Sequence, residues 1–531
     1  MRLNLLKRPS IAFGVILAIE LGSLVRLLPI ALHDFPLNDG GLFYRMTQDL
    51  AANGFRLPLM TSYNGGGIPF AYPPLGFYLA ASLQLATNAP LLELVRWLPG
   101  LFSILTIPAF YLLARRILSS GELATIAVLT FALIPRSHEW LVMGGGLARS
   151  PGMLFSILSL IQADRLLERP TWKNASLLGL LVALVTVSHL EMAWFTLFSL
   201  ALFWIFRGRT WKSLGGVGMA LAVAAALSSF WWLPVIATHG VTPLLQAALT
   251  GQHPWSSSAA ILMEFTGERY LGVFVVLNLL GVLLCLAQRD FLLPAWLIST
   301  NLLDPRAAGT HASAPVAMLA ALALVLVVLP PLIPQAGHAK ATQGNPSIPI
   351  PSLPASTRRT RNLVVAALAF YGLCAALLAP ALPSSPIAVL RPGEVDVMQW
   401  IGDNLPTSGE FVVVSGRTRW GSDPLSEWFP ALADRVSLAT PQGKEWTGGL
   451  AETAKRHQTL QLCAQRGLRC LEGWLAEGKT RFDYVLVATY PDSSAIQTVA
   501  LVEGLSQSQE YEMVYSNPEA VVFSHRSTDS P

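Results

Sequence analysis

The chain reads Asn38-Asp39-Gly40-Gly41-Leu42-Phe43-Tyr44-Arg45-Met46 directly after its first long apolar run, residues 11–32. A second stretch, Ala71-Tyr72-Pro73-Pro74-Leu75-Gly76-Phe77-Tyr78, opens the next apolar segment with two prolines. The first stretch places an acid at a membrane surface. The second predicts a membrane-surface or re-entrant helix over 73–88. Together they predict a long outer loop with surface helices over 33–93.

Composition places the chain in a membrane. It is 53% hydrophobic and 13% charged, whereas soluble domains carry about 25% charged residues. Long apolar stretches recur from residue 11 to residue 382, which predicts a polytopic α-helical membrane protein. The net charge of +4 comes from basic residues in short loops, which suits membrane orientation, so no nucleic-acid partner is expected.

The basic residues also allow the spans to be threaded. The run 11–32 is too long for a signal-peptide core and is expected to remain as a span. The positive-inside rule then places the N-terminus in the cytoplasm and the C-terminal region outside the cell membrane. About eleven spans are expected, over residues 11–32, 95–114, 121–135, 151–166, 174–188, 190–206, 213–234, 269–287, 291–302, 313–331 and 362–382.

Two interruptions divide the apolar part of the chain. Ser188-His189-Leu190-Glu191 breaks the block 174–206, which is too long for one span of about 20 residues. It therefore predicts a helical hairpin with its tip on the outer side. Residues 332–361 are rich in Pro, Ser and Thr, which predicts an inner linker with little structure.

Residues 383–531 change character and predict a small extracytoplasmic α/β domain behind a transmembrane domain of residues 1–382. Strand-like runs at 411–414, 484–487, 511–515 and 519–524 are separated by helical patterns near 393–404, 450–475 and 494–505. Cys463 and Cys470 both lie in this region, where an oxidising compartment would allow a disulfide between them.

Polar residues of the spans and loops fall mostly on the outer side of this threading. Ionisable groups near hydrocarbon are costly and usually face a cavity or one another. They therefore predict one polar pocket at the outer surface, although a solvated set of loops would have the same composition. The candidates are Asp34, Asp39, Arg45, His138, Glu139, Arg149, His189, Glu191, Asp304, Arg306 and His311.

The two opening stretches resemble the first outer loop of the GT-C superfamily of membrane glycosyltransferases, and in particular the aminoarabinose-transferase and protein-mannosyltransferase group. In those families an acid follows the first span and starts a surface helix. A Pro-Pro-Leu segment then leads to a second surface helix, as Pro73-Pro74-Leu75 does here. Arg96 and Arg115-Arg116 match the basic residues at the two ends of the next span. The resemblance covers residues 1–210 and reaches 304–311 less closely.

The resemblance implies inverting transfer of a sugar from a polyprenyl phosphate or diphosphate outside the membrane. A carboxylate takes the acceptor proton or holds the acceptor, and cations stabilise the departing phosphate. Asp39 is the expected carboxylate, and it could also cap the surface helix after it. Arg306 is the expected phosphate ligand because its planar fork suits phosphate oxygens, although it could instead be an arginine that snorkels from a span end. Arg149 and Arg45 are further candidates.

The chain departs from the family in its second outer loop. The family often carries an Asp there, whereas this chain reads Gly144-Gly145-Gly146-Leu147-Ala148-Arg149-Ser150-Pro151. Glu139 is then the candidate for a second carboxylate. No recognised metal-ligand spacing is evident, so no cofactor is expected, and a divalent metal stays open. The remaining candidates for the substrate pocket are His138, His189, Glu191, Asp304, His311 and, from the outer domain, Glu427.

The sequence thus favours a multi-pass cell-membrane glycosyltransferase. Its partners would be the lipid bilayer, a polyprenyl-phosphate-linked sugar donor, and a lipid, glycan or protein acceptor. The alternatives are a transporter or flippase for a lipid-linked or polar solute, and a non-catalytic envelope scaffold. A transporter is less favoured because the polar residues gather at one surface rather than at the membrane centre, and because no internal repeat is evident.

Overall fold

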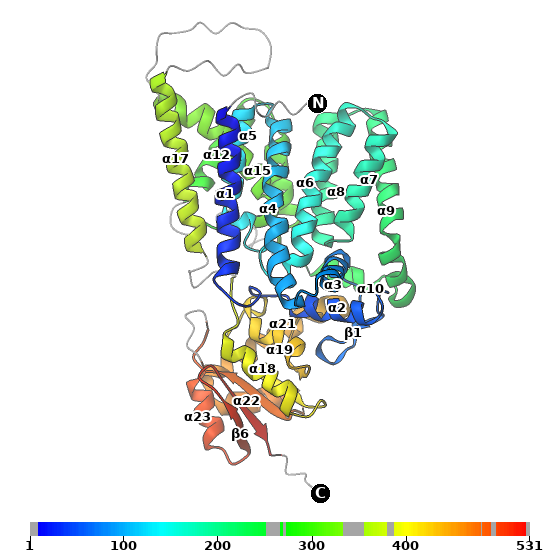
Figure 1. The fold of residues 1–531 in the computed structure, drawn as a ribbon, viewed down its shortest axis with the longest axis vertical. Coiled ribbons are helices and arrows are strands. Elements are labelled where there is room, and N and C mark those ends of the chain that lie inside the picture. Colours follow the sequence, from blue (N-terminus) through cyan, green and yellow to red (C-terminus); the bar gives the residue numbers. More distant parts are fainter. Residues whose placement is uncertain are drawn as a thin grey trace.

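The computed structural model describes residues 9–250, 266–268, 272–332, 355–379, 387–478, 481–489 and 495–526. Long helices run side by side through one part of the molecule, and the C-terminal helices and strands lie beyond one end of them (Figure 1). The long helices are α1 (Pro9–Ala31), α4 (Leu91–Leu118), α5 (Gly121–Leu133), α6 (Gly146–Glu168), α7 (Trp172–Thr186), α8 (Leu190–Phe203), α9 (Trp211–His239), α12 (Val273–Ala287), α13 (Leu292–Leu303), α15 (Ser313–Ala323) and α17 (Ala355–Leu378).

Each predicted span coincides with one of these helices. Six helical segments of the described residues are long and apolar enough to cross a membrane, namely Pro9–Ala31, Leu91–Leu118, Leu190–Gly208, Trp211–His239, Ser313–Pro331 and Arg359–Leu378. The chain is therefore a mostly helical membrane protein. The other predicted spans coincide with α5, α6, α7, α12 and α13, and the count of about eleven crossings stays a prediction.

Polar caps set the start of several of these helices at the end remote from the C-terminal region. The Ser120 side chain accepts from Leu123 N at the start of α5. Thr171 accepts from Asn174 N at α7, and Thr210 accepts from Ser213 N at α9. Ser and Thr are favoured there because their oxygens satisfy backbone donors that the first helical turn leaves unpaired.

The first outer loop forms the surface elements that the sequence predicted. It holds α2 (Gly41–Ala52), the short strands β1 (Met60–Thr61) and β2 (Ile68–Pro69), the turn η2 (Tyr63–Gly65), and α3 (Leu75–Thr87). In Figure 1 these elements lie at the same end of the helices as the C-terminal region. Helices α7 and α8 form the predicted hairpin, with His189 at the N-cap of α8.

Short elements connect the remaining helices. The turn η3 (Pro135–Ser137) follows α5, and α10 (Thr242–Leu249) follows α9. The helix α14 (Ala308–His311) lies between α13 and α15. Two helices continue through π-helical turns, η4 (Trp204–Gly208) after α8 and η5 (Leu324–Val328) before α16 (Leu329–Leu332).

The C-terminal region contains a five-stranded mixed sheet with strand order β4-β3-β5-β7-β6. Strand β3 is parallel to both neighbours, with Phe411 opposite Tyr484 on β5, whereas β7 is antiparallel to β5 and β6. The strands are β3 (Glu410–Val414), β4 (Val436–Ser437), β5 (Tyr484–Ala488), β6 (Tyr511–Ser516) and β7 (Ala520–His525). The helices and turns are α18 (Pro392–Asn404), η7 (Trp420–Ser422), α19 (Pro424–Leu432), α20 (Lys444–Thr447), α21 (Leu450–Arg466), α22 (Leu468–Gly478) and α23 (Val499–Gln507).

Two predicted boundaries need correction. The helix expected over 450–475 is two helices, because Gly467 adopts a φ of +77° that ends α21. A disulfide between Cys463 and Cys470, the pairing that the sequence allowed, spans this break. The linker expected over 332–361 is shorter, since α17 begins at Ala355. Residues 333–354 lie outside the described part of the chain.

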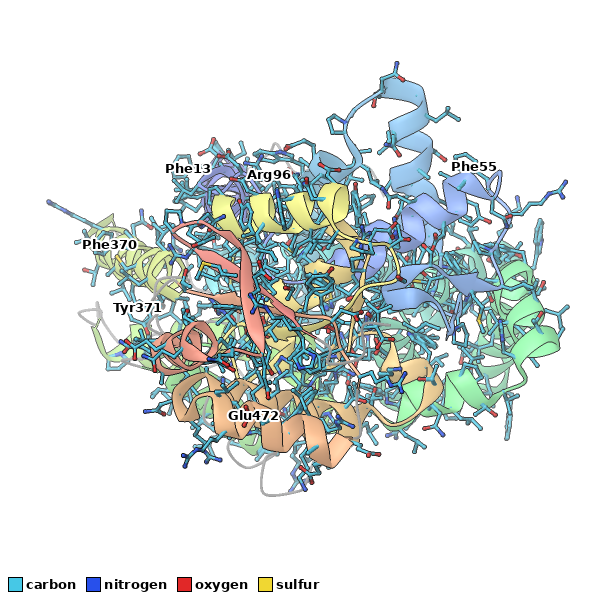
Figure 2. The ribbon with its side chains drawn as sticks, turned by 90° about the horizontal axis from the view of Figure 1, so that it is seen from below. Phe13, Phe55, Arg96, Phe370, Tyr371 and Glu472 are labelled. Carbon is cyan, nitrogen blue, oxygen red and sulfur yellow. A yellow bond between two sulfur atoms is a disulfide. The ribbon has the colours of Figure 1, made fainter. Side chains whose placement is uncertain are left out.

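The sheet has two apolar faces that pack against different parts of the molecule. Val412, Val414 and Val485 face α21, α22 and α23. Phe411 and Val413 belong instead to a cluster shared with the first outer loop and with α19. Alternation along a strand explains this division, because successive side chains point to opposite faces. The second cluster joins the C-terminal region to the membrane part through a continuous core. Viewed from this end (Figure 2), C-terminal elements lie across the ends of the long helices.

Candidate active site

Asp39 lies in the loop between α1 and α2, and its carboxylate joins the first two outer loops. Its Oδ1 accepts a hydrogen bond from Gly145 N at 2.8 Å. Its Oδ2 forms an ion pair with Arg149 of α6. The Asp39 side chain remains 15% exposed, so the carboxylate is held in place and still reaches solvent.

Glycines allow these two loops to pack closely. Gly144 N donates to Leu37 O at 2.9 Å. A Cβ on Gly144 would overlap the Asp39 carbonyl oxygen. Gly40 has a φ of +131°, a backbone conformation that favours glycine. A run of three glycines such as Gly144-Gly145-Gly146 is compatible with a flexible loop or with a backbone that contacts a ligand. In the structure these glycines allow the second outer loop to pack tightly against the first.

Glu427 approaches the same place from the C-terminal region. Its Oε1 accepts from Gly40 N at 2.8 Å, and its Oε2 accepts from the Gln442 amide at 3.1 Å. The side chain is buried, and this burial, together with the negative charge of Asp39, raises the pKa of Glu427 to about 8. Glu427 is thus bonded to the backbone amide directly after Asp39, so two residues far apart in sequence bring their carboxyl groups to one place.

The helix that carries Glu427 is held from both sides. Asp423 caps α19 through Ser426 N and accepts hydrogen bonds from Ser415 Oγ at 2.7 Å and His457 Nε2 at 2.9 Å. On the membrane side, the Trp428 indole donates to Asn38 O at 3.0 Å. These contacts position Glu427 relative to Asp39.

The hairpin tip and the loop after α13 form a second polar group. Arg306 Nε lies 3.4 Å from Glu191 Oε1, and Arg306 Nη1 donates to Thr250 Oγ1 at 3.0 Å. His311 Nδ1 and Asp304 Oδ2 are 2.5 Å apart. Burial lowers the pKa of His189 at the hairpin tip to about 3, so this imidazole is neutral at physiological pH.

One cavity of about 1610 Å³ connects these groups. Its apolar wall comes from α8, α9 and α10, with Trp194, Trp231 and Leu244 among its residues. Another part of its lining comes from the C-terminal region and includes Trp420 and Lys455. Seven of the residues predicted for a pocket line it: Asp39, Arg149, His189, Glu191, Asp304, Arg306 and Glu427. An adjoining cavity of about 350 Å³ also contains His311.

Arg45 lines neither cavity, so the structure does not bring it together with the other predicted phosphate ligands. Leu42 and Phe43 of α2 line the cavity. Arg45 instead pairs with Asp434 of the C-terminal region and donates to Gln48 at 3.3 Å.

His138 and Glu139 are buried beside η3 and line neither of the two cavities. Burial, followed by the nearby positive charge of Arg26, lowers the pKa of His138 well below its usual value. Glu139 lies 3.5 Å from Arg136. Glu139 therefore does not lie at the pocket where the sequence predicted a second carboxylate. Glu427 is the carboxyl group that the fold brings near Asp39.

Several lining residues were not among the sequence candidates. Trp140 and Arg136 lie within two residues of His138 and Glu139 in the sequence. The sequence therefore predicted the correct segment, but not which of its side chains line the smaller cavity. Lys455 lies on an ordinary polar helix, and nothing in its sequence context distinguishes it. Among the described residues, no group of three or more His, Cys, Asp or Glu is arranged to hold a metal ion.

Comparison with known proteins agrees with this architecture. The family described as 6-pyruvoyl-tetrahydropterin synthase related domain, membrane protein, matches residues 71–328. No curated protein matches the chain at a significant level. The chain is also similar to solved structures of glycosyltransferases, among them one archaeal and one mycobacterial enzyme.

The archaeal oligosaccharyltransferase AglB from Archaeoglobus fulgidus superposes with a TM-score of 0.53 and 13% identity, over 99% of this chain and 75% of the enzyme. Arabinofuranosyltransferase AftD from Mycobacteria superposes with a TM-score of 0.54 and 17% identity, over 99% of this chain and 40% of AftD. Both are GT-C glycosyltransferases, so the chain has the GT-C fold and the predicted resemblance is confirmed.

Proposed function

We propose that the protein is a glycosyltransferase that takes a sugar from a lipid-linked phosphate donor. The observation that carries this proposal is one cavity whose lining combines an apolar wall, a carboxylate and two guanidinium groups. The carboxylate is Asp39, and the guanidinium groups belong to Arg149 and Arg306. Such a site offers separate surfaces to a lipid chain, a phosphate and a sugar acceptor.

The apolar wall suits the lipid part of the donor. Trp194 and Leu197 of α8 line the cavity and are also exposed on the helix surface. Because an exposed face of a membrane helix meets lipid, the cavity wall continues into the bilayer. A polyprenyl chain could therefore remain among lipid while its phosphate enters the cavity.

Each polar group then has a chemical task. Asp39 takes the proton of the acceptor hydroxyl or amine as that atom attacks the anomeric carbon. The bond from the anomeric carbon to the phosphate oxygen breaks, and the lipid phosphate leaves with the electron pair. Arg306, 41% exposed and paired with Glu191 at 3.4 Å, stabilises the charge on the leaving phosphate. Direct displacement inverts the configuration at the anomeric carbon of the sugar.

The C-terminal region supplies the acceptor side of the site. Glu427 is the second carboxyl group beside Asp39, and Trp420 offers an aromatic surface for a sugar ring. The positive-inside argument places this region outside the cell membrane, with the N-terminus in the cytoplasm. Transfer would then take place on the extracytoplasmic side, to a lipid, glycan or protein.

The test is a transfer assay in membranes with radiolabelled polyprenyl-linked sugars and native extract as acceptor. Arg306→Ala should raise the donor KM about 10- to 150-fold, the effect of losing a charged hydrogen bond of about 1.5–3 kcal/mol. Arg45→Ala, which removes an arginine outside the cavity, is the matched control. An unchanged donor KM would remove Arg306 from the phosphate site. No product from any donor would count against sugar transfer.

A further inference from the structure

The smaller cavity of about 350 Å³ adjoins the reaction site and is unusually rich in arginine. Arg136 of η3, Arg149 of α6 and Arg306 of the loop after α13 all line it. Glu191 is the one carboxylate among the described residues that line it. Asp39 and Glu139, the ion-pair partners of Arg149 and Arg136, do not line this cavity. The surface that faces an occupant therefore presents three guanidinium groups and one carboxylate, which favours an anion.

The two cavities meet at shared residues. Arg149, Glu191 and Arg306 line both, so an anion beside Asp39 in the larger cavity contacts the arginines at the junction. Arg136 lines only the smaller cavity. It therefore lies beyond the position of a single phosphate that Arg149 and Arg306 hold.

Arg136 is held at this place, and among the described residues its guanidinium group makes only one charged contact. Its side chain crosses the loop after α13, because a Cβ on Gly309 would come within 3.3 Å of Arg136 Cδ. Its one charged partner among the described residues is Glu139, at 3.5 Å, which is longer than a normal N–H···O hydrogen bond of about 2.7–3.2 Å. The side chain is 28% exposed. A fork of five donors with one loose contact is suited to a phosphoryl group.

We propose that the donor is linked to its lipid through a diphosphate, with one phosphoryl group at Arg149 and Arg306 and the other at Arg136. This inference rests on the proposed function and narrows its substrate class. A sugar monophosphodiester carries one negative charge and would leave Arg136 without a ligand. A diphosphodiester carries two, one on each phosphoryl group, so that each group has a guanidinium partner. On transfer, the sugar–oxygen bond breaks, the lipid diphosphate leaves with the electron pair, and Asp39 holds the acceptor proton.

The test is direct binding of farnesyl monophosphate and farnesyl diphosphate to the purified protein in detergent. A diphosphate binds any cationic site more tightly because of its charge, so the informative quantity is the effect of Arg136→Gln on each Kd. The diphosphate Kd should rise at least tenfold in Arg136→Gln, and the monophosphate Kd should change less than twofold. Arg136→Lys should give an intermediate diphosphate Kd, because lysine keeps the charge and loses the fork.

Two controls separate this proposal from the function on which it rests. Arg96→Gln, which removes an arginine bonded to Glu93 and Ile30 outside both cavities, should leave both affinities unchanged. Equal effects of Arg136→Gln on the two ligands, or no effect on either, would overturn the diphosphate subsite alone. Failure of both ligands to bind the wild-type protein would overturn the lipid-phosphate function as well. The unchanged monophosphate Kd also shows that the variant is folded.

Discussion

Replacement of Asp39 by Asn tests the centre of the proposed mechanism. Asn keeps an oxygen that can accept from Gly145 N, which lies 2.8 Å from Asp39 Oδ1. It also keeps the side-chain volume, while Arg149 retains its hydrogen bond to Trp140 O at 3.2 Å. The variant therefore loses chiefly a negative charge and a proton acceptor.

The expected loss of activity is much larger than the expected loss of stability. A positioned general base contributes about 10²- to 10⁴-fold, so the barrier should rise by about 3–5 kcal/mol. The ion pair of Asp39 with Arg149 is partly exposed, at 15% and 20%. Solvent screening therefore limits the cost to folding to about 1 kcal/mol, and Tm should fall by only a few degrees.

The assay compares initial transfer rates in membranes with equal amounts of inserted protein, together with thermal unfolding of the purified variants. Asp34→Asn is the matched control, because Asp34 lies in the same loop, is fully exposed, and has Arg96, at 3.8 Å, as its one charged partner in the described part of the chain. Asp34→Asn should transfer at the wild-type rate. If Asp39→Asn transfers within tenfold of that control, Asp39 is not the base and the mechanism proposed for it is wrong.

Two further variants test the packing around Asp39. Because the pKa of Glu427 is raised to about 8 in the folded protein from 4.5, the unfolded chain binds fewer protons than the native state between these pH values. Wild-type Tm should therefore fall more steeply than the Tm of Glu427→Gln from about pH 4.5 to pH 8. Glu512→Gln, an exposed control, should follow the wild type. Parallel plots of Tm against pH for the wild type and Glu427→Gln would show that Glu427 is not held protonated. Gly144→Ala should abolish most transfer and lower Tm, because its Cβ would overlap the Asp39 carbonyl. Gly421→Ala, whose Cβ meets open space although Gly421 also lines the cavity, should remain active, and equal activity of the two variants would refute the role of the loop contact.

Much of the fold follows from local sequence properties. Apolar runs bounded by basic residues predicted helices at each expected span, and a break at Ser188-His189 predicted the α7–α8 hairpin. Strand-like runs such as 411–414 and 484–487 became β3 and β5. The two-residue strand β4 and the helix α19 were missed because each is stabilised by tertiary packing and too short to carry a periodic pattern.

Less of the candidate site could be predicted from the sequence. Asp39 follows from motif position and Arg306 from its charge and place in the threading, and both line the larger cavity. Arg45 lies close to Asp39 in sequence, but its ion pair with Asp434 of the C-terminal region could not be predicted from the chain. Glu139 is expected as the second carboxylate because it belongs to the second outer loop in the chain, yet it lines neither cavity.

Sequence patterning decided that this chain is a membrane protein in which a long loop with Asp39 near its start follows the first apolar run, because hydrophobicity and charge act on each segment separately. The meeting of Asp39, Arg149 and Glu427 was decided only by the tertiary structure. It depends on glycine-permitted contact between two loops and on a shared apolar core that docks the C-terminal region. These contacts join residues 110 and 387 positions apart, and no local pattern encodes which distant partners will pack together.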